Sequence, residues 1–305
     1  MKKNSAKKQN TLVHRLVSPA RWRERLGGAA FLGPSLLGVA VFFIVPFGVV
    51  VYYSLIDNPI SHEFVGLQNF TALFKNPAFR QAAGNTLKFS AVAVPLAVIL
   101  SLALALLLEC RIPMKSQLRT FFLSPLMVPV ASVVLIWQVL FHYNGALNAI
   151  LGLTGDARID WFNSEYGMIP VILLYLWKNL GYNMILFVAA LANIPRDLLE
   201  AATIEGASAA YRFFAIKLRY LSPTVLFVTI FSMINSFKVF REVYLLTGDY
   251  PYESLYMLQH YMNNMFERLD YQKLSAAAVV MAIALVIIIA VLFIVENRFG
   301  KDVEG

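Results

Sequence analysis

The stretch "EAATIEGASAAYRFFAIKLRYLSP", from Glu200 to Pro223, is polar at its start, rich in small residues in its middle and basic near its end. Long apolar blocks precede and follow it. Charged groups are costly inside a bilayer, so a segment of this kind must lie outside the lipid. The stretch therefore predicts that the chain leaves the membrane here and enters it again.

The composition indicates an integral membrane protein. Of its 305 residues, 59% are hydrophobic and 14% are charged, whereas soluble domains carry about 25% charged residues. The net charge of +8 does not indicate nucleic-acid binding, because the basic residues lie in the termini and loops. The single cysteine, Cys110, excludes an internal disulfide.

Six apolar segments are long enough to cross a hydrocarbon core, which requires about 20 helical residues. They are Phe31–Ile56, Thr86–Leu108, Leu118–Phe141, Met168–Leu191, Thr224–Leu246 and Leu274–Val295. The sequence therefore predicts an all-α integral membrane fold with six transmembrane helices. We expect a basic tail over residues 1–28 and a transmembrane domain over residues 29–305.

The distribution of basic residues predicts the orientation. Of the 26 lysines and arginines, 17 lie in the tail, the second and fourth connections and the C-terminal end, and 6 lie in the other connections. Cytoplasmic loops carry the excess of positive charge. Both termini and the stretch from Glu200 are therefore expected on the cytoplasmic side, with the first span retained as an anchor because no cleavage site follows it.

Enzymatic and metal chemistry find little support in the sequence. No GxxxxGK loop is present to bind ATP. The four histidines, His14, His62, His142 and His260, lie apart in the tail and outer loops. We expect surface or interfacial histidines, no metal site and no catalytic residues. Function should come from transport or from contacts with other subunits.

Polar side chains interrupt the fourth and fifth predicted spans. They include Lys178, Asn179, Asn183, Ser232, Asn235, Ser236 and Lys238. Three- and four-residue spacing places Asn179, Tyr182 and Asn183 on one face, and the spacing of Ser232, Asn235 and Ser236 does the same. Amides and hydroxyls suit a neutral, hydroxyl-rich ligand. They also form hydrogen bonds between packed membrane helices, and the residues alone leave both interpretations open.

The segment after Pro195 predicts a short helix with a carboxylate, Glu200, in its first turns and small residues on one side. The small residues, Ala201, Ala202 and Gly206, allow close approach by another protein. A plain helical connector between spans is the alternative.

"EAATIEGASAAYRFFAIKL" after "IPRDL" resembles the cytoplasmic EAA loop of ABC-importer membrane subunits, and more narrowly the sugar and oligosaccharide branch typified by the maltose permease. "FVGLQNF", "NTLKFS" and "VYLLTG" also fall in the order of that family. The resemblance implies a coupling loop at about residues 194–223 between helices four and five. It implies that Glu200 meets a basic group on an ATPase subunit, and that Ala201, Ala202 and Gly206 permit close packing there.

The resemblance also implies partners and a location. It implies a second homologous permease subunit, two ATPase subunits that bind ATP and Mg, an extracytoplasmic solute-binding protein and a sugar substrate. The chain itself would hold no cofactor. It would lie in the cytoplasmic membrane of a bacterium or archaeon. A free-standing secondary transporter and an integral-membrane enzyme are the alternatives, but the sequence shows neither inverted repeats nor clustered catalytic groups.

Candidate substrate-path residues follow from the same resemblance. It places Lys178, Asn179, Tyr182, Ser232, Asn235 and Ser236 at or beside sugar-contacting positions. Tyr182 and Ser232 match the family pattern, whereas both asparagines and Lys178 replace apolar or small residues, and lysines would also tolerate an acidic sugar. One further departure is Arg219 where the family has proline. We therefore expect the helix after the coupling loop to run on without the usual kink.

Overall fold

The computed structural model describes residues 31–110 and 113–299, and the basic tail predicted for residues 1–28 lies outside this part. The described chain is helical, apart from turns, loops and an isolated bridge between Ile56 and Phe64. The α-helices are α3 (Val45–Leu55), α4 (Gln68–Lys75), α5 (Pro77–Glu109), α6 (Lys115–Leu123), α7 (Val130–Leu140), α8 (Ala146–Ile150), α9 (Met168–Ala192), α10 (Arg196–Ile204), α11 (Ala209–Tyr211), α12 (Leu218–Tyr220), α13 (Ser222–Lys238), α14 (Phe240–Thr247), α15 (Leu258–Glu267) and α16 (Tyr271–Phe299).

Within the described residues, five helical segments are long and apolar enough to cross a membrane. They are Phe31–Leu55, Pro77–Glu109, Glu165–Ala192, Ser222–Thr247 and Tyr271–Arg298. They coincide with the first, second, fourth, fifth and sixth predicted spans. The second begins earlier than predicted, because Asn76 accepts a hydrogen bond from the Ala78 N–H and so caps the helix at Pro77.

The third predicted span, Leu118–Phe141, is not one continuous helix. Lys115–Met127 and Val130–Leu140 meet at an angle of 101°, so a sixth span exists only if this bent pair counts as one. Pro129 causes the break. It lacks an N–H donor and forces Val128 into an extended conformation with ψ 126°. The sequence predicted a span here but not its bend, because hydropathy does not register a change of direction.

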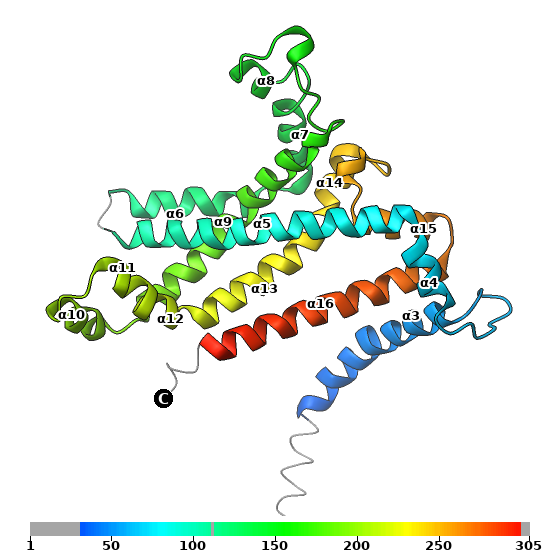
Figure 1. Cartoon of the computed structure of the whole chain (residues 1–305), viewed down its shortest axis with the longest axis horizontal. Coiled ribbons are helices and arrows are strands. Elements are labelled where there is room, and N and C mark those ends of the chain that lie inside the picture. Colours follow the sequence, from blue (N-terminus) through cyan, green and yellow to red (C-terminus); the bar gives the residue numbers. More distant parts are fainter. Residues whose placement is uncertain (1–30, 111–112, 300–305) are drawn as a thin grey trace, which may run out of the picture.

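The core forms where α5, α9 and α13 pack together (Figure 1). Phe89 of α5 and Tyr175 of α9 meet edge to face there, with ring centroids 5.5 Å apart. Gly181 allows α6 to lie against α9, since a Cβ at this position would be 1.8 Å from the Phe122 carbonyl oxygen. This close approach holds the segment after α6 beside α9.

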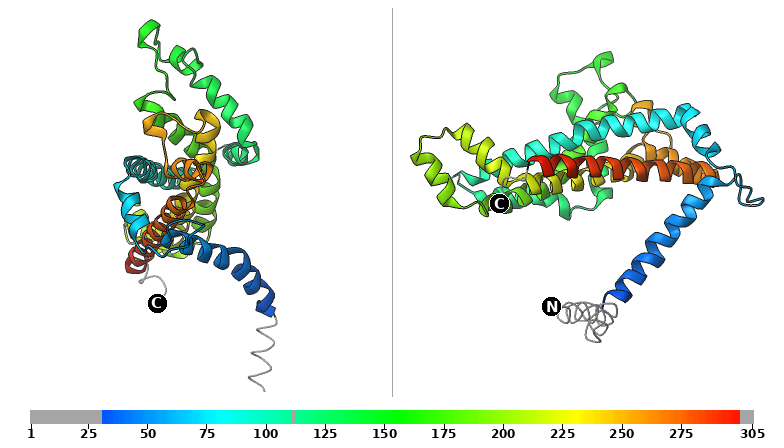
Figure 2. Two further views of the ribbon diagram at one scale, coloured as in Figure 1. Left: turned by 90° about the vertical axis from the view of Figure 1, so that its right-hand side faces the viewer. Right: turned by 60° about the horizontal axis from the view of Figure 1, so that its bottom comes forward.

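The first helix, Phe31–Leu55, packs against α16 near its C-terminal end and diverges from the bundle toward its N-terminal end (Figures 1 and 2). Its apolar side chains are largely exposed, as for Phe42 at 76%. Such exposure suits a lipid environment rather than water.

The helix predicted after Pro195 is present as α10. The chain reverses at Gly206, which has φ +81°, and from Ala209 it stays helical through the π-helical turn Arg212–Lys217. Leu221, between α12 and α13, keeps a right-handed helical conformation with φ −84° and ψ −9°. A turn at Leu221 nevertheless separates α12 from α13, so the helix that contains Arg219 ends at Tyr220 rather than running on as expected.

His260 corrects the expectation of surface or interfacial histidines. It lies in α15 with no exposed surface, and its Nδ1 accepts a hydrogen bond from the Met257 N–H at 3.2 Å. Burial lowers the pKa of His260 to about 4, although the Asp249 carboxylate opposes the shift. The neighbours that bury His260, such as Phe240, belong to other segments of the chain. The sequence of α15 alone therefore gave no sign of this burial.

Candidate functional site

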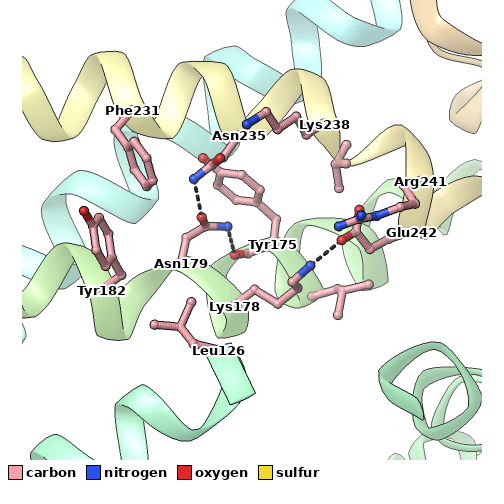
Figure 3. A pocket seen from close by; sticks show the side chains of 12 residues that line it. Leu126, Tyr175, Lys178, Asn179, Tyr182, Phe231, Asn235, Lys238, Arg241 and Glu242 are labelled. Atoms are coloured by element: carbon pink, nitrogen blue, oxygen red, sulfur yellow. Dashed lines mark hydrogen bonds and ion pairs between the residues drawn. The ribbon is translucent and has the colours of Figure 1, made fainter. Parts of the chain in front are cut away.

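A cavity of about 460 Å³ lies between α9, α13, α14 and the turn Ser124–Met127 (Figure 3). Its lining residues are Leu126, Leu174, Tyr175, Lys178, Asn179, Tyr182, Phe231, Asn235, Lys238, Val239, Arg241 and Glu242. Four of the six predicted path residues, Lys178, Asn179, Tyr182 and Asn235, therefore line one cavity.

The two asparagines form a short chain of hydrogen bonds. Asn179 Nδ2 donates to the Tyr175 carbonyl oxygen one helical turn earlier, at 2.8 Å. Asn235 Nδ2 donates to Asn179 Oδ1 at 3.0 Å and links α13 to α9 (Figure 3). Both amides are thus oriented before any ligand arrives, and the Asn235 carbonyl group keeps its capacity to accept a hydrogen bond.

The structure does not bring Ser232 and Ser236 to this cavity. Ser232 is fully buried, and its Oγ accepts from Asn183 Nδ2 at 2.9 Å. Ser236 Oγ lies 2.9 Å from Ser90 Oγ on α5. Successive helical residues are separated by about 100°. Asn235 therefore points to a different side of α13 from Ser236, and the two serines connect packed helices.

Charged residues complete one end of the cavity. Lys178 Nζ forms an ion pair with Oε1 of Glu242 on α14. Glu242 is 4% exposed, and its Oε2 has no hydrogen-bond partner within the described residues. Lys238 and Arg241 line the same cavity. The sequence analysis did not single out Glu242 or Arg241 as site residues, although a carboxylate in the span that follows that of Lys178 was a usable signal.

The opposite flank is aromatic. The rings of Tyr182 and Phe231 lie 4.9 Å apart, and the Tyr182 hydroxyl has no hydrogen-bond partner within residues 31–110 and 113–299. A largely apolar wall with a few oriented polar groups is typical of small-molecule sites. The cavity can accept a solute that carries both hydroxyl groups and apolar ring faces.

The predicted coupling residues lie on a separate hairpin. Glu200 and Ala201 of α10 are exposed, and Ala202 is partly exposed. Arg212 closes the hairpin by donating to Thr203 Oγ1 at 2.8 Å. Gly206 has open space around it, so its positive φ, rather than its small size alone, explains the glycine at this turn.

The hairpin is also anchored to the bundle. Lys217 Nζ pairs with Glu109 Oε2 at the end of α5, at 2.6 Å. No residue of α10 is buried, and Ile204 is 87% exposed. An apolar side chain this exposed beside small residues is available for contact with another protein.

In the described part of the chain, no three histidine, cysteine, aspartate or glutamate side chains are grouped as a metal site would require. The candidate site is therefore built from amides, aromatic rings and an ion pair.

Residues 97–305 match the model of the family described as binding-protein-dependent transport system inner membrane component. The chain belongs to this family. It is accordingly a multi-pass inner-membrane permease, the non-catalytic membrane component of an ABC importer. Family membership replaces the alternatives of a secondary transporter and a membrane enzyme.

Curated relatives match over most of their length. The chain is 33% identical to the sulfoquinovosyl glycerol transport system permease protein SmoG of Agrobacterium fabrum, with 86% of this chain and 88% of that protein covered. It is 30% identical to the trehalose/maltose transport system permease protein MalF of Thermococcus litoralis, with 94% and 99% covered.

A solved structure has the same fold. It is that of a bacterial ABC transporter involved in the import of the acidic polysaccharide alginate, and one of its chains superimposes with a TM-score of 0.76. The superposition covers 91% of this chain and 99% of that chain at 20% sequence identity, so the likeness concerns the fold.

Proposed function

We propose that this chain forms half of a translocation pore for a sugar or sugar derivative, driven by ATP hydrolysis on separate subunits. The observation that carries the proposal is the cavity in which Asn179, Tyr182 and Asn235 meet, because its oriented amides and unpartnered hydroxyl suit a hydroxyl-bearing solute. The solutes named for the relatives support this class, since they include sulfoquinovosyl glycerol, trehalose, maltose and glycerol-3-phosphate.

On this proposal the transmembrane domain extends over residues 29–305, and both termini lie in the cytoplasm. The excess of lysine and arginine in the tail and in the second and fourth connections supports that orientation. The hairpin of α10 and α11 then lies on the cytoplasmic side, within the coupling loop at about residues 194–223.

We assign the importer's other functions to partners. A second homologous permease would close the pore, and an extracytoplasmic binding protein would deliver the solute. Two ATPase subunits would hold ATP and Mg. An alginate transporter with a similar chain has been solved in complex with a pentasaccharide-bound periplasmic protein, and it provides a precedent for such an assembly.

The cavity would hold its cargo weakly. The Asn235 side-chain carbonyl can accept from a solute hydroxyl, and the Tyr182 hydroxyl can donate. Each exchanged hydrogen bond contributes about 1 kcal/mol net. A few such contacts orient the solute without trapping it, which a transport pathway requires.

The test uses the permease reconstituted with its partner permease, ATPase subunits and binding protein. The double substitution Asn179→Ala and Asn235→Ala should lower uptake of the cognate solute several-fold, because two oriented amides are lost. Binding-protein-stimulated ATP hydrolysis should survive. Asn263→Ala is the matched control, since that amide bonds Glu267 on α15, outside the cavity. Normal uptake by the double variant at normal abundance would remove the cavity from the pathway.

The coupling proposal is tested in the same assembly. Glu200→Lys reverses an exposed charge on α10 and should reduce ATP-driven uptake at least several-fold, because it weakens docking without disturbing a buried contact. Asp156→Lys, a charge reversal at another exposed position, is the control. Wild-type uptake and ATPase co-purification with Glu200→Lys would show that α10 is not the docking element.

A further inference from the structure

The charges that line the cavity do not balance. Three basic side chains, Lys178, Lys238 and Arg241, face it, while Glu242 is the only acidic residue among those that line it. Because Lys178 and Glu242 neutralise each other, two positive charges remain. A cavity built for a neutral sugar alone would need no such excess.

The two remaining cations have no internal partner. Within residues 31–110 and 113–299, Lys238 and Arg241 take part in no ion pair or hydrogen bond. Basic side chains within transmembrane segments ordinarily pair with acids or face an aqueous path. In Figure 3, Arg241 and Glu242 lie at the same end of the cavity as Lys178, and Lys238 lies near Asn235 on α13. One of the two unpaired cations therefore lies beside the ion pair.

We propose that the cargo of this cavity is a sugar derivative with one anionic group: a carboxylate, a sulfonate or a phosphate ester. This inference rests on the proposed function and narrows its substrate class. The anionic group would lie between Lys238 and Arg241, where the guanidinium can donate two parallel hydrogen bonds to it. The solute's hydroxyl groups would reach the amide of Asn235 and the hydroxyl of Tyr182.

The arrangement also explains how an anion could cross and still leave. An ionised group loses hydration when it enters a low-dielectric span, and nearby cations offset that loss. Glu242 holds Lys178 and repels an anion at short range, so the solute would meet a net charge of two rather than three. Tight retention is thereby avoided.

The experiment measures weak binding to the complete assembly in lipid nanodiscs, without binding protein, by saturation-transfer NMR. The probes are methyl glucoside and methyl glucuronoside, which differ by a CH₂OH and a carboxylate. We expect the glucuronoside to bind at least about tenfold more tightly, the scale of one charge-assisted hydrogen bond, with the preference falling as salt is raised.

Substitution identifies the source of the preference. Lys238→Gln with Arg241→Gln should bring the ratio of the two affinities close to one while binding of the neutral glucoside persists, which also shows that the variant is folded. Lys75→Gln, an exposed lysine on α4 outside the cavity, should keep the wild-type ratio.

The outcomes separate the two proposals. Equal affinities in the wild type, or a preference that survives the double substitution, would overturn the anionic assignment and show that the partner subunit's charges neutralise this cavity or that the anion binds elsewhere. The sugar pathway would then stand on the uptake assay alone. Binding of neither probe would overturn the cavity as a solute site and both proposals with it.

Discussion

Two faces of α13 carry polar side chains, and they serve different purposes. On one face Ser232 and Ser236 are buried, and each meets a polar group of α9 or α5. On the other, Asn235 and Lys238 line the cavity. Polarity within a span therefore does not mark a solute path by itself. The distinction is whether the neighbouring helix already supplies every partner.

The largest expected effect comes from adding a side-chain atom where α6 packs closely against α9. Gly181→Ala should severely reduce folded protein, because the new Cβ would lie 1.8 Å from the Phe122 carbonyl oxygen, where only backbone could move aside. Overpacking of this kind costs about 1–3 kcal/mol, occasionally more. Thermal unfolding in detergent and the yield of monodisperse protein measure the effect.

Gly84→Ala provides the matched control within α5. A Cβ there would meet nothing within 4 Å, and replacing a helical glycine by alanine should leave stability unchanged or raise it by up to about 1 kcal/mol. Equal stability of the two variants would mean that α6 and α9 do not approach as closely as described, and the cavity wall near Leu126 would lose its support.

The sequence predicted the spans better than it predicted the site. Long apolar runs predicted five of the helices in the described residues, because a helix that crosses the lipid core requires such a run. The bend at Pro129 was not predicted, although the proline is present in the sequence. Hydropathy averages over a window and cannot register a change of direction, so the bend in the third span was not predicted.

The site was only partly predictable for a geometric reason. Three- and four-residue spacing grouped Ser232, Asn235 and Ser236, yet these residues spread around α13 widely enough to face two different neighbours. Which direction opens onto a cavity depends on where α5 and α9 lie, and one helix's spacing contains no such information. Glu242 was not predicted as a site residue, because its partner, Lys178, lies on another helix and the spacing within one helix does not show their contact.

Two smaller expected effects give the sharpest form of the comparison. Ser232→Ala removes the acceptor of Asn183 Nδ2, and the Asn183 Oδ1 is already buried without a partner in the described structure. The amide would then have no partner at all. Interhelical hydrogen bonds in membranes contribute about 0.6 kcal/mol on average and up to about 1.7, so we expect stability to fall by about 1–2 kcal/mol, with transport per folded molecule unchanged.

Asn235→Ala should show the reverse pattern. Its amide faces the cavity, where water can replace the lost contact with Asn179, so unfolding should shift by less than about 0.5 kcal/mol. Transport per folded molecule should nevertheless decline, and modestly, because one contact among several is lost. Unfolding and uptake should be measured in parallel for both variants. We expect Ser232→Ala to change mainly stability and Asn235→Ala to change mainly transport. If Asn235→Ala destabilises the protein as much as Ser232→Ala and leaves uptake intact, Asn235 is a packing residue like the serines, and α13 has one polar role rather than two.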